Sequence, residues 1–569
     1  MMRTVDALEA SYPQIAQPNE EARPTLLDSL KRRKLLVIII VTVVIGLCAR
    51  VYRLDAAGFA EDEANKVFAV RAYQQGDFSA NAEHPMLMKM LCYGSLHAFS
   101  AWNRVAGQRL HLPVSEEVAL RLPNAVFGAL TVVPLFLLAT GLLGFRAGVI
   151  TSVLWALGLD AIWFNRIAKE DTLLVFFEFA GFYLYLRAKH LPPSDREGKE
   201  RLFALAGAAF GLMVTSKYFP HYIGLNALFY TIVGYDSRNN RPLTRTMWAK
   251  YLGGMLLAFA LFNPSAFFPQ TWRYLWKYVN EEFLTHHGYF MMDRLYLNDL
   301  SQTPGGTPWY FYPLFIALKL PLPVLAAFLI GFVEIFRRRG DYPHSRGYIF
   351  LRLMLFFWLI PELVVGVKFL RYSLTLLPLI YMTAAVGTVV IWKALETWLR
   401  RITTRSIARV APAFIVNAAL LIAPAVLTIR CLLNSYPSLY VNVFANSRVG
   451  YFFPHDEFYD LGARESIRFV AETAPQDATL ASEIPGVVEY YLERFDRPDI
   501  RSRIISQPGF ALSRDRPDFV LLQRGRVYFE NIDVFRFIEK TSPAVQSSVF
   551  EGATASRVYS TGNRRALTE

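Results

Sequence analysis

Long apolar runs recur over roughly the first three quarters of the sequence, separated by short polar segments. A membrane-spanning helix needs about 20 mostly apolar residues. A chain that is 53% hydrophobic and only 19% charged is too apolar for a soluble protein of 569 residues. Eleven runs occur, at residues 35–49, 122–144, 147–164, 171–188, 202–217, 220–234, 251–268, 309–336, 347–366, 372–392 and 410–430. The pattern predicts an α-helical polytopic membrane protein with about eleven transmembrane helices.

The first apolar run follows a polar tail and a basic block, Lys31 to Lys34. A basic block before a short apolar run is typical of a signal peptide as well as of a first transmembrane helix. Val51 and Tyr52 extend the run if the Arg50 side chain reaches out to the membrane surface. We therefore favour an uncleaved first helix, with residues 1–34 as a cytosolic tail.

Basic residues collect in alternate polar segments, as the positive-inside rule predicts for cytosolic loops. They gather near residues 187–201, 238–250, 337–346 and 393–409. With eleven helices and the N-terminus inside, a first loop (52–121), a later loop (269–308) and the C-terminal region lie on the outer side. Topology thus explains the net charge of +13, and we expect no nucleic-acid partner.

The composition changes near residue 434, where the long apolar runs end. Short apolar clusters at 478–484 and 519–523 follow a helix-like stretch at 462–472. This pattern predicts a transmembrane domain over 35–433 and a small soluble extracytoplasmic α/β domain over 434–569. The three cysteines have no paired spacing, so they predict neither a disulfide framework nor a metal knuckle.

The first outer loop contains three consecutive carboxylates, Glu61, Asp62 and Glu63. In a helix, Asp62 shares a face with Lys66, whereas Glu63 points about 100° away. Two acids therefore face different ways from one turn, and one of them has a cation beside it. The alternative is an acidic helix N-terminus in solvent, which the helix dipole favours by itself.

Other outer segments bring charged and aromatic residues to the same side of the membrane. They are His84 and Lys89 in the first loop; Arg166, Lys169, Glu170 and Asp171; Lys217; His286, His287, Asp293 and Arg294 in the later loop; and Lys368, Arg371 and Tyr372. Acids and cations gathered at one membrane face suit a substrate whose phosphate lies at the interface while its tail lies in the lipid.

The chain resembles the protein O-mannosyltransferase family in two signatures of the first loop, Asp62-Glu63-Ala64 and His84-Pro85-Met86-Leu87-Met88-Lys89. Three later segments, 166–171, 211–218 (GLMVTSKY) and 371–378 (RYSLTLLP), are similar to that family and to the aminoarabinose transferases of lipid A, in the same order. Met86 departs from the family, which usually has a second proline there. The resemblance covers roughly residues 35–390 and indicates a bacterial-type member without a β-trefoil insertion.

The resemblance implies a C-type glycosyltransferase (GT-C) fold in a bacterial inner membrane. It implies a polyprenyl-phosphate sugar as donor and a protein, lipid or glycan acceptor. Asp62 is then the catalytic base, and Glu63 and Asp171 orient the acceptor or the base. The implied substrate-binding residues are His84, Lys89, Arg166, Lys169, Lys217, Lys368, Arg371 and Tyr372. A divalent metal ion between carboxylates and phosphate is compatible with this assignment.

This chemistry is consistent with the residue types present. A sugar on a lipid phosphate already has a good leaving group, so the site needs positive charge around the departing phosphate rather than a strong acid. The planar guanidinium of Arg371 can bind two phosphate oxygens. An ionised Asp62 on the opposite face can accept the proton of an acceptor hydroxyl, which predicts inversion at the anomeric carbon.

Several of these residues also have structural interpretations. Asp171 can cap the helix that it begins. Lys217 and Lys368 can extend from helix ends to the membrane surface. His84 can be a packed loop residue, and the neighbouring pair His286-His287 is too close in sequence to chelate one ion easily.

Two other classes of protein fit parts of the pattern. A transporter or flippase of lipid-linked sugars usually has repeated halves and ionisable groups at mid-membrane, whereas this chain shows no internal repeat and its charges gather at one surface. A sensor with an outer ligand-binding domain leaves the acidic first loop unexplained. Within the transferase class the sugar and the acceptor stay open. We expect the loop 269–308 and the C-terminal domain to select the acceptor.

Overall fold

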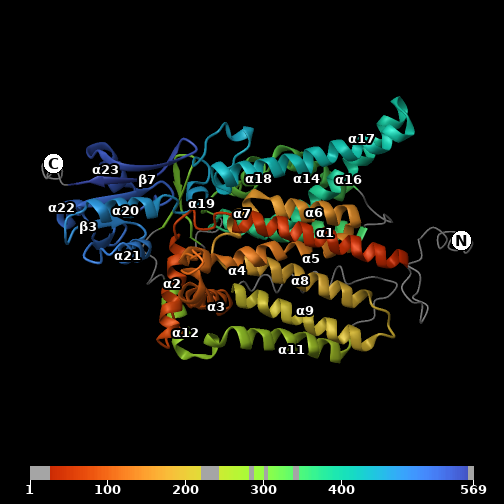
Figure 1. Ribbon diagram of the computed structural model, residues 1–569, viewed down its shortest axis with the longest axis horizontal. Helices are drawn as coiled ribbons and strands as arrows, with labels where there is room; N and C mark the ends of the chain where they lie inside the picture. The colour runs from red at the N-terminus through yellow and green to blue at the C-terminus, as the bar shows by residue number, and fades with distance from the viewer. Residues whose placement is uncertain (1–25, 219–242, 281–286, 300–304, 338–344, 562–569) are drawn as a thin grey trace, which may run out of the picture.

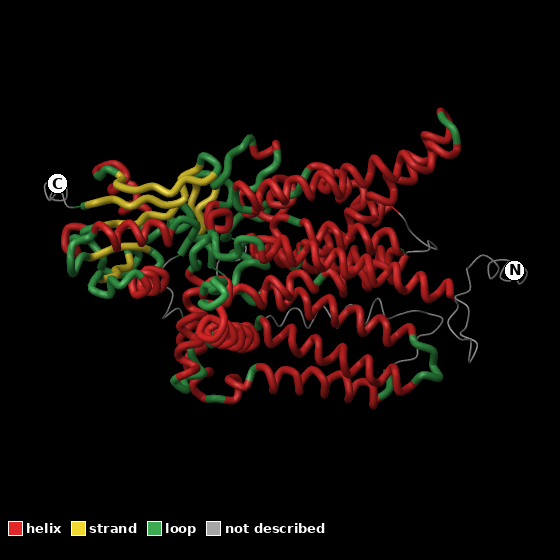
Figure 2. Tube along the Cα trace, viewed as in Figure 1, coloured by secondary structure: helices red, strands yellow, loops and turns green. Residues whose placement is uncertain are grey.

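The computed structural model describes residues 26–218, 243–280, 287–299, 305–337 and 345–561. Most of these residues form long helices that run side by side, and a smaller α/β part lies at one end of them (Figures 1 and 2). A mostly helical architecture with a small C-terminal sheet is thus confirmed.

The helical part comprises elements from α1 to α18. Their bounds are α1 Leu26–Val51, α2 Glu61–Gln74, α3 Met86–Trp102, α4 Glu116–Leu130, α5 Val132–Leu143, α6 Phe145–Leu157, α7 Leu159–Phe164, α8 Asp171–His190, α9 Arg196–Ser216, α11 Arg245–Phe262, α12 Pro269–Val279, α13 Phe311–Lys319, α14 Leu322–Arg337, α15 Ser345–Val364, α16 Leu377–Ile402, α17 Arg405–Asn417 and α18 Ala423–Asn434. The 3₁₀ turn η5 spans Leu370–Leu374, and the hairpin β1 (Tyr289–Met291) and β2 (Arg294–Tyr296) is antiparallel.

Four helical stretches among the described residues are long and apolar enough to cross a membrane. They are Glu116–Leu143, Arg346–Val364, Leu377–Ile402 and Val410–Asn434. Two shorter apolar helices are Leu35–Val51 and Phe145–Leu157. The predicted number of eleven is therefore not confirmed, and the predicted run at 220–234 lies outside the described residues.

The predicted helix at 309–336 is wrong in its continuity, because two helices replace it. α13 ends at Lys319, and Leu320 has an extended backbone before Pro321. Proline disfavours the helical backbone conformation of the residue before it, so Pro321 breaks the helix at Leu320. The side-chain amide of Asn442 donates hydrogen bonds to the carbonyls of Ala317 (2.7 Å) and Leu320 (3.0 Å), which the break leaves without helical partners.

The predicted first outer loop, residues 52–121, is mostly helical. Figure 1 shows α2 running across the ends of the long helices rather than along them. The first turn of α2 carries Glu61, Asp62 and Glu63, where negative charge is favoured by the helix dipole. The Glu63 carboxylate also accepts a hydrogen bond from the backbone N–H of Ala60 (3.1 Å). These contacts fix the helix start and hence the direction of the Asp62 side chain.

The C-terminal part contains a five-stranded sheet in the order β4-β3-β5-β7-β6. Its elements are α19 Pro454–Phe458, α20 Ala463–Thr473, β3 Thr479–Ser482, α21 Pro485–Arg494, β4 Arg501–Ile504, α22 Leu512–Asp515, β5 Phe519–Gln523, α23 Ile532–Thr541, β6 Ala544–Phe550 and β7 Ala553–Ser560. β3 pairs in parallel with β4 and β5, whereas β7 is antiparallel to β5 and β6. The predicted clusters at 478–484 and 519–523 are β3 and β5, and the stretch at 462–472 is α20.

The α/β part packs directly on the first outer loop. The backbone N–H of Phe59 donates to the hydroxyl of Tyr491 (2.7 Å), and Arg494 pairs with Glu117 (2.7 Å). Val67 of α2 and Val487 of α21 belong to one buried apolar cluster. Because α2 carries the acidic triplet, this packing brings C-terminal residues close to it.

Candidate active site

The Asp62 carboxylate lies where four separate segments meet. One oxygen, Oδ1, accepts a hydrogen bond from Lys169 Nζ (2.6 Å), which follows α7. The other, Oδ2, accepts from the hydroxyl of Tyr459 (2.7 Å) and lies 3.6 Å from the guanidinium of Arg371. The Asp62 side chain keeps 28% of its surface exposed, whereas Lys169 keeps 6%. A partly exposed carboxylate thus has a buried lysine and a mostly buried arginine beside it.

A second layer of alternating charges supports Lys169. Its ammonium lies 3.2 Å from His84 Nε2 and 3.7 Å from the buried Glu170 carboxylate. Glu170 in turn pairs with the buried Lys66 at 2.9 Å. Two buried lysines sharing one buried glutamate hold an excess of positive charge beside Asp62, which is the arrangement that an anionic ligand requires.

This environment sets the protonation states of the central groups. Burial alone would raise the pKa of the Asp62 carboxyl, but the neighbouring cations, Lys169 first, hold it well below its usual range. Burial also holds the pKa of His84 well below its usual range, so its ring is neutral and Nε2 can accept from Lys169. The pKa of Lys169 itself is lowered by burial, although Asp62 opposes that effect.

Glu63 faces away from this group, as the helical spacing predicts. Its carboxylate forms two hydrogen bonds with Arg121, at 2.8 and 2.6 Å, and a third with the backbone N–H of Ala168 (3.0 Å). Glu63 is fully buried, and Arg121 also donates to carbonyls of the preceding loop, including Leu54 (2.8 Å). This geometry favours a structural role for Glu63 over an acceptor-orienting one.

Three predicted substrate-binding residues donate to backbone carbonyls instead. Lys89 donates to Asn81 (2.5 Å) and His84 (2.8 Å), and Lys368 donates to Thr307 (2.8 Å). Arg166 donates to the carbonyl of Arg53 (2.7 Å). Each of these three cations holds a loop near the site through backbone carbonyls. The geometry therefore does not favour direct binding of substrate by them, and that role stays a prediction.

Asp171 and Lys217 form a second ion pair, 2.6 Å long and buried. The Lys217 ammonium also lies 4.3 Å from the ring centroid of Tyr372, next to Arg371 in the chain. The Arg371 guanidinium lies over Phe369 at 4.2 Å, and its buried Nε has no hydrogen-bond partner among the described residues. Arg371 thus lies beside Asp62, and the neighbouring Tyr372 lies beside Lys217, so this segment contacts a member of each ion pair.

Sequence reasoning missed three residues of the α/β part. Tyr459 reaches Asp62, while Asp460 accepts the backbone N–H of Glu61 (3.1 Å) and pairs with Arg526 (2.6 Å). Arg526 also pairs with Glu61 at 2.6 Å. Tyr459 and Asp460 have positive φ angles of 43° and 63°, which are uncommon outside glycine and mark a conformation that the surroundings enforce. The sequence signal that could have indicated this region is the high density of titratable residues in the segment His455-Asp456-Glu457-Phe458-Tyr459-Asp460.

The divalent metal ion that the resemblance allows stays a prediction. Across the described ranges, no group of three His, Cys, Asp or Glu residues is placed to hold one. Asp62 is already surrounded by two cations and a tyrosine hydroxyl. Of the two histidines of the later loop, His286 lies outside the described residues, and His287 pairs with Glu530 at 2.9 Å.

Comparison with known proteins finds a family match over part of the chain. Residues 108–268 match the model of a family described as dolichyl-phosphate-mannose-protein mannosyltransferase. This match agrees with the resemblance found in the motifs. The matched residues include Lys169, Asp171 and Lys217 but neither Asp62 nor Arg371. No curated protein matches the sequence.

Solved structures similar to this chain include ArnT, an oligosaccharyltransferase and a protein O-mannosyltransferase. ArnT from Cupriavidus metallidurans bound to undecaprenyl phosphate has 13% identity and a TM-score of 0.48, with 93% of this chain and 98% of that chain covered. The oligosaccharyltransferase AglB from Archaeoglobus fulgidus, in complex with an inhibitory peptide and a dolichol-phosphate, has 12% identity, a TM-score of 0.49 and coverage of 94% and 75%. The Pmt1-Pmt2 complex of S. cerevisiae bound to the sugar donor has 17% identity, a TM-score of 0.33 and coverage of 44% and 35%.

Proposed function

We propose that the protein transfers a sugar from a polyprenyl-phosphate carrier to an acceptor hydroxyl, at the extracytoplasmic face of a bacterial inner membrane. The observation that carries this proposal is the Asp62 carboxylate, partly exposed and held between Lys169 and Arg371. It combines a proton acceptor with the cations that a phosphate needs. The apolar helices next to the site supply the path for a polyprenyl tail.

The reaction can be written with the groups that are present. The acceptor oxygen forms a bond to the anomeric carbon, and its proton passes to Asp62. The bond between that carbon and the phosphate oxygen breaks, and its electron pair stays on the phosphate. The leaving phosphate thereby gains a second negative charge, which Arg371 and Lys169 stabilise more than they stabilise the donor. Attack opposite the phosphate inverts the anomeric carbon.

Donor binding also explains how a strongly acidic carboxyl can act as a base. Without donor, Lys169 and Arg371 direct their positive charge at Asp62. A bound phosphate shares these cations, which weakens their hold on Asp62 and raises its affinity for a proton. Binding of the phosphate therefore prepares the base for the step that follows.

The pH dependence follows from these shifts. The value of kcat/KM, which reports the free protein, is expected to stay constant as pH falls from 7 to 5, because Asp62 remains ionised. The acid limb of kcat is expected at a higher pH than that of kcat/KM, because bound phosphate raises the Asp62 pKa. An alkaline limb is expected below the usual lysine value of about 10.4, because burial lowers the pKa of Lys169.

Rates measured between pH 4 and 10 on purified protein test this expectation. A kcat/KM that falls with a midpoint near 6 contradicts it. The stability contribution of Asp62 has the corresponding sign: since the folded pKa is depressed, the contribution is present above about pH 4 and is lost as pH falls through the folded pKa.

A donor panel tests the function itself. Purified protein in nanodiscs is incubated with polyprenyl-phosphate mannose, pentose and hexuronic acid, each with a peptide, lipid A or glycan acceptor, and free polyprenyl phosphate is measured. We expect one donor to be consumed, which also names the sugar. Movement of labelled lipid across liposomes without donor consumption identifies a flippase instead and overturns the proposal.

A further inference from the structure

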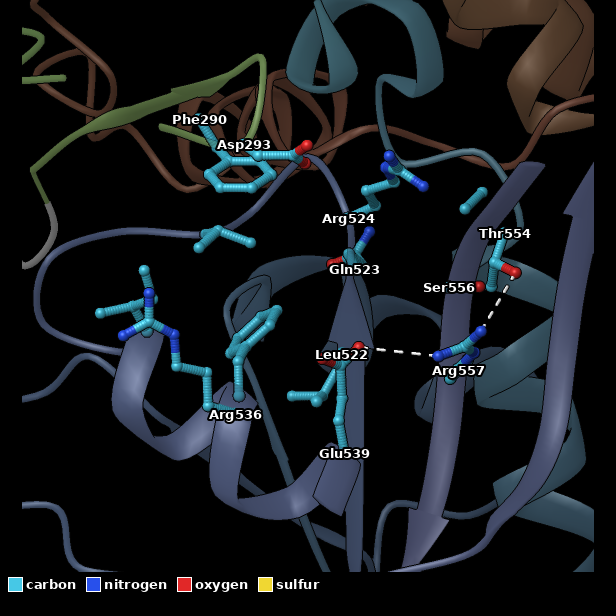
Figure 3. Close-up of a pocket in the computed structure, with 14 residues that line it drawn as sticks. Phe290, Asp293, Leu522, Gln523, Arg524, Arg536, Glu539, Thr554, Ser556 and Arg557 are labelled. Carbon is cyan, nitrogen blue, oxygen red and sulfur yellow. Dashed lines mark hydrogen bonds and ion pairs between the residues drawn. The ribbon is translucent and has the colours of Figure 1, made fainter. Parts of the chain in front are cut away.

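Two cavities of the protein differ in the charges that line them. The cavity in Figure 3, of about 330 Å³, is lined by the hairpin β1–β2 and the C-terminal sheet. Its lining includes the carboxylates of Asp293 and Glu539, and Arg524 and Arg557 lie in the same lining. This mixture selects no particular charge in a ligand. A larger cavity, of about 530 Å³, lies in the helical part.

The larger cavity lies at the end of the helices that is remote from Asp62. It is lined by the C-terminal parts of α14 and α16 and by residues of α5, α6 and α15. α16 begins at Leu377, shortly after Arg371, which lies beside Asp62. From Leu377 to Arg401 the helix rises about 36 Å, at about 1.5 Å per residue, and the hydrocarbon core of a membrane is about 30 Å thick. Because α16 is long and apolar enough to cross a membrane, the cavity lies at the level of the second interface, where phospholipid headgroups are.

Cations outnumber acids in the lining of this larger cavity. Arg337 ends α14, and Lys393 and Arg401 belong to the C-terminal half of α16. These three side chains are exposed, and within the described ranges they form no ion pair and no side-chain hydrogen bond. Glu334 is the one carboxylate among the lining residues that the structure describes. An excess of guanidinium and ammonium groups at a concave site suits a phosphate.

The inner wall of the cavity is apolar and buried. It contains Leu143, Ala147, Tyr348 and Val386, none of which is more than 6% exposed. Val333 of α14, which is 62% exposed, continues the apolar surface outward along the helix. A phosphate that carries glycerol and acyl chains would cover this wall, whereas inorganic phosphate would leave it in contact with water. The cavity therefore suits an amphiphile with a negatively charged head.

Two tryptophans support the position of the cavity at a membrane interface. Trp398 lines the cavity and is 56% exposed. Trp392, one and a half helical turns earlier in α16, lies under the guanidinium of Arg146, which is 4.7 Å from its ring centroid. Tryptophan is enriched where the hydrocarbon of a membrane meets the headgroups. The aromatic residues thus place the cavity at the same level as the length of α16 does, and Arg146 adds a further cation there.

We propose that this cavity binds the headgroup of an anionic phospholipid, with its phosphate on Arg337 and Arg401 and its glycerol and upper acyl chain against the apolar inner wall. Basic pockets between transmembrane helices are known to bind anionic headgroups in this way. The site is separate from Asp62 and goes beyond the proposed transfer reaction. A bound lipid would connect the ends of α14 and α16 with the turn between α5 and α6, which come from distant parts of the chain.

Lipid binding to the full-length protein, delipidated in an uncharged detergent, tests this proposal by native mass spectrometry. The probes are phosphatidylglycerol, phosphatidylcholine with the same acyl chains, and inorganic phosphate. One variant combines Arg337→Gln with Arg401→Gln and removes two cations, and a second, Ala394→Trp, fills the cavity from an exposed position of its lining. Arg400→Gln is the matched control, because Arg400 is in the same turn of α16 but is 55% exposed, pairs with Glu396 and does not line the cavity.

We expect the wild type and Arg400→Gln to bind phosphatidylglycerol about tenfold more tightly than phosphatidylcholine, because each basic residue near the headgroups adds to the attraction of anionic lipid. Both cavity variants are expected to lose this preference. Equal binding of the two lipids by the wild type overturns the inference, as does an unchanged preference in both cavity variants. Inorganic phosphate that binds as tightly as phosphatidylglycerol overturns the assignment to a lipid. No sugar donor is present, so the result is independent of the proposed function.

Discussion

Asp62→Asn is expected to reduce kcat by about 10²–10⁴-fold, the usual contribution of a general base, while the protein stays folded and still binds donor. The amide has nearly the same shape as the carboxylate but cannot accept the acceptor proton. The change also frees Lys169 and Arg371 from their anionic partner, so donor affinity should stay the same or increase. Single-turnover release of polyprenyl phosphate measures the first quantity, and equilibrium binding of donor measures the second.

Asp77→Asn is the matched control for this variant. Asp77 follows α2 in the same loop, and the contacts of its side chain are with Ser79, at 2.9 and 2.6 Å. It should keep the wild-type rate. If Asp62→Asn turns over donor within threefold of the wild type, Asp62 is not the base. If it loses donor binding and rate together, its main role is to position the cations.

Glu63→Gln is expected to lower the free energy of unfolding by about 3–5 kcal/mol, the usual cost of removing one partner of a buried ion pair. Both groups of the pair are almost fully buried, with 4% of Arg121 and 1% of Glu63 exposed. The variant leaves the guanidinium without its counter-charge. Unfolding in nanodiscs by heat and by denaturant measures the loss, and kcat of the folded fraction at low temperature should stay close to that of the wild type.

Glu493→Gln provides the comparison for the buried pair. It breaks an ion pair of similar length, 2.9 Å to Arg71, in which the side chains are 40% and 62% exposed. Exposed pairs contribute about 0–1 kcal/mol, so this variant should unfold almost as the wild type does. A Glu63→Gln protein that is stable but has lost kcat would instead restore the acceptor-orienting role suggested by the family resemblance.

The sequence predicted that Asp62 and Lys169 lie at one membrane face, and the structure brings them into contact, whereas Lys66, expected beside Asp62, pairs with Glu170. Asp62 and Lys169 come together because motifs on successive outer segments end at the same level of the bundle. The sequence could not show that Lys89 and Lys368 turn toward carbonyls. A lysine beside a loop looks the same in sequence whether it binds a ligand or closes the loop, since only the fold decides which carbonyls lack donors.

The helix and strand predictions were correct where the hydropathy pattern changes along the chain and wrong where it does not. Apolar runs placed the helices, and two short clusters placed strands β3 and β5. The break at Leu320 was missed because the run stays apolar on both sides, so hydropathy does not register the effect of Pro321. Tyr459 was missed because 397 residues separate it from Asp62 in the chain, and no periodic pattern connects positions so far apart.

The same separation has a consequence for biosynthesis. Asp62 is synthesised first, whereas Tyr459 follows it by 397 residues, and Asp460 and Arg526 come later still. Until the α/β part has folded, the backbone N–H of Glu61 lacks its acceptor, and the Glu61 side chain lacks its cation. The groups around Asp62 thus reach the observed arrangement only after the α/β part has been synthesised and has folded. If the proposed function holds, a protein truncated before the α/β part is expected to consume no polyprenyl-phosphate sugar, so activity depends on synthesis of that part.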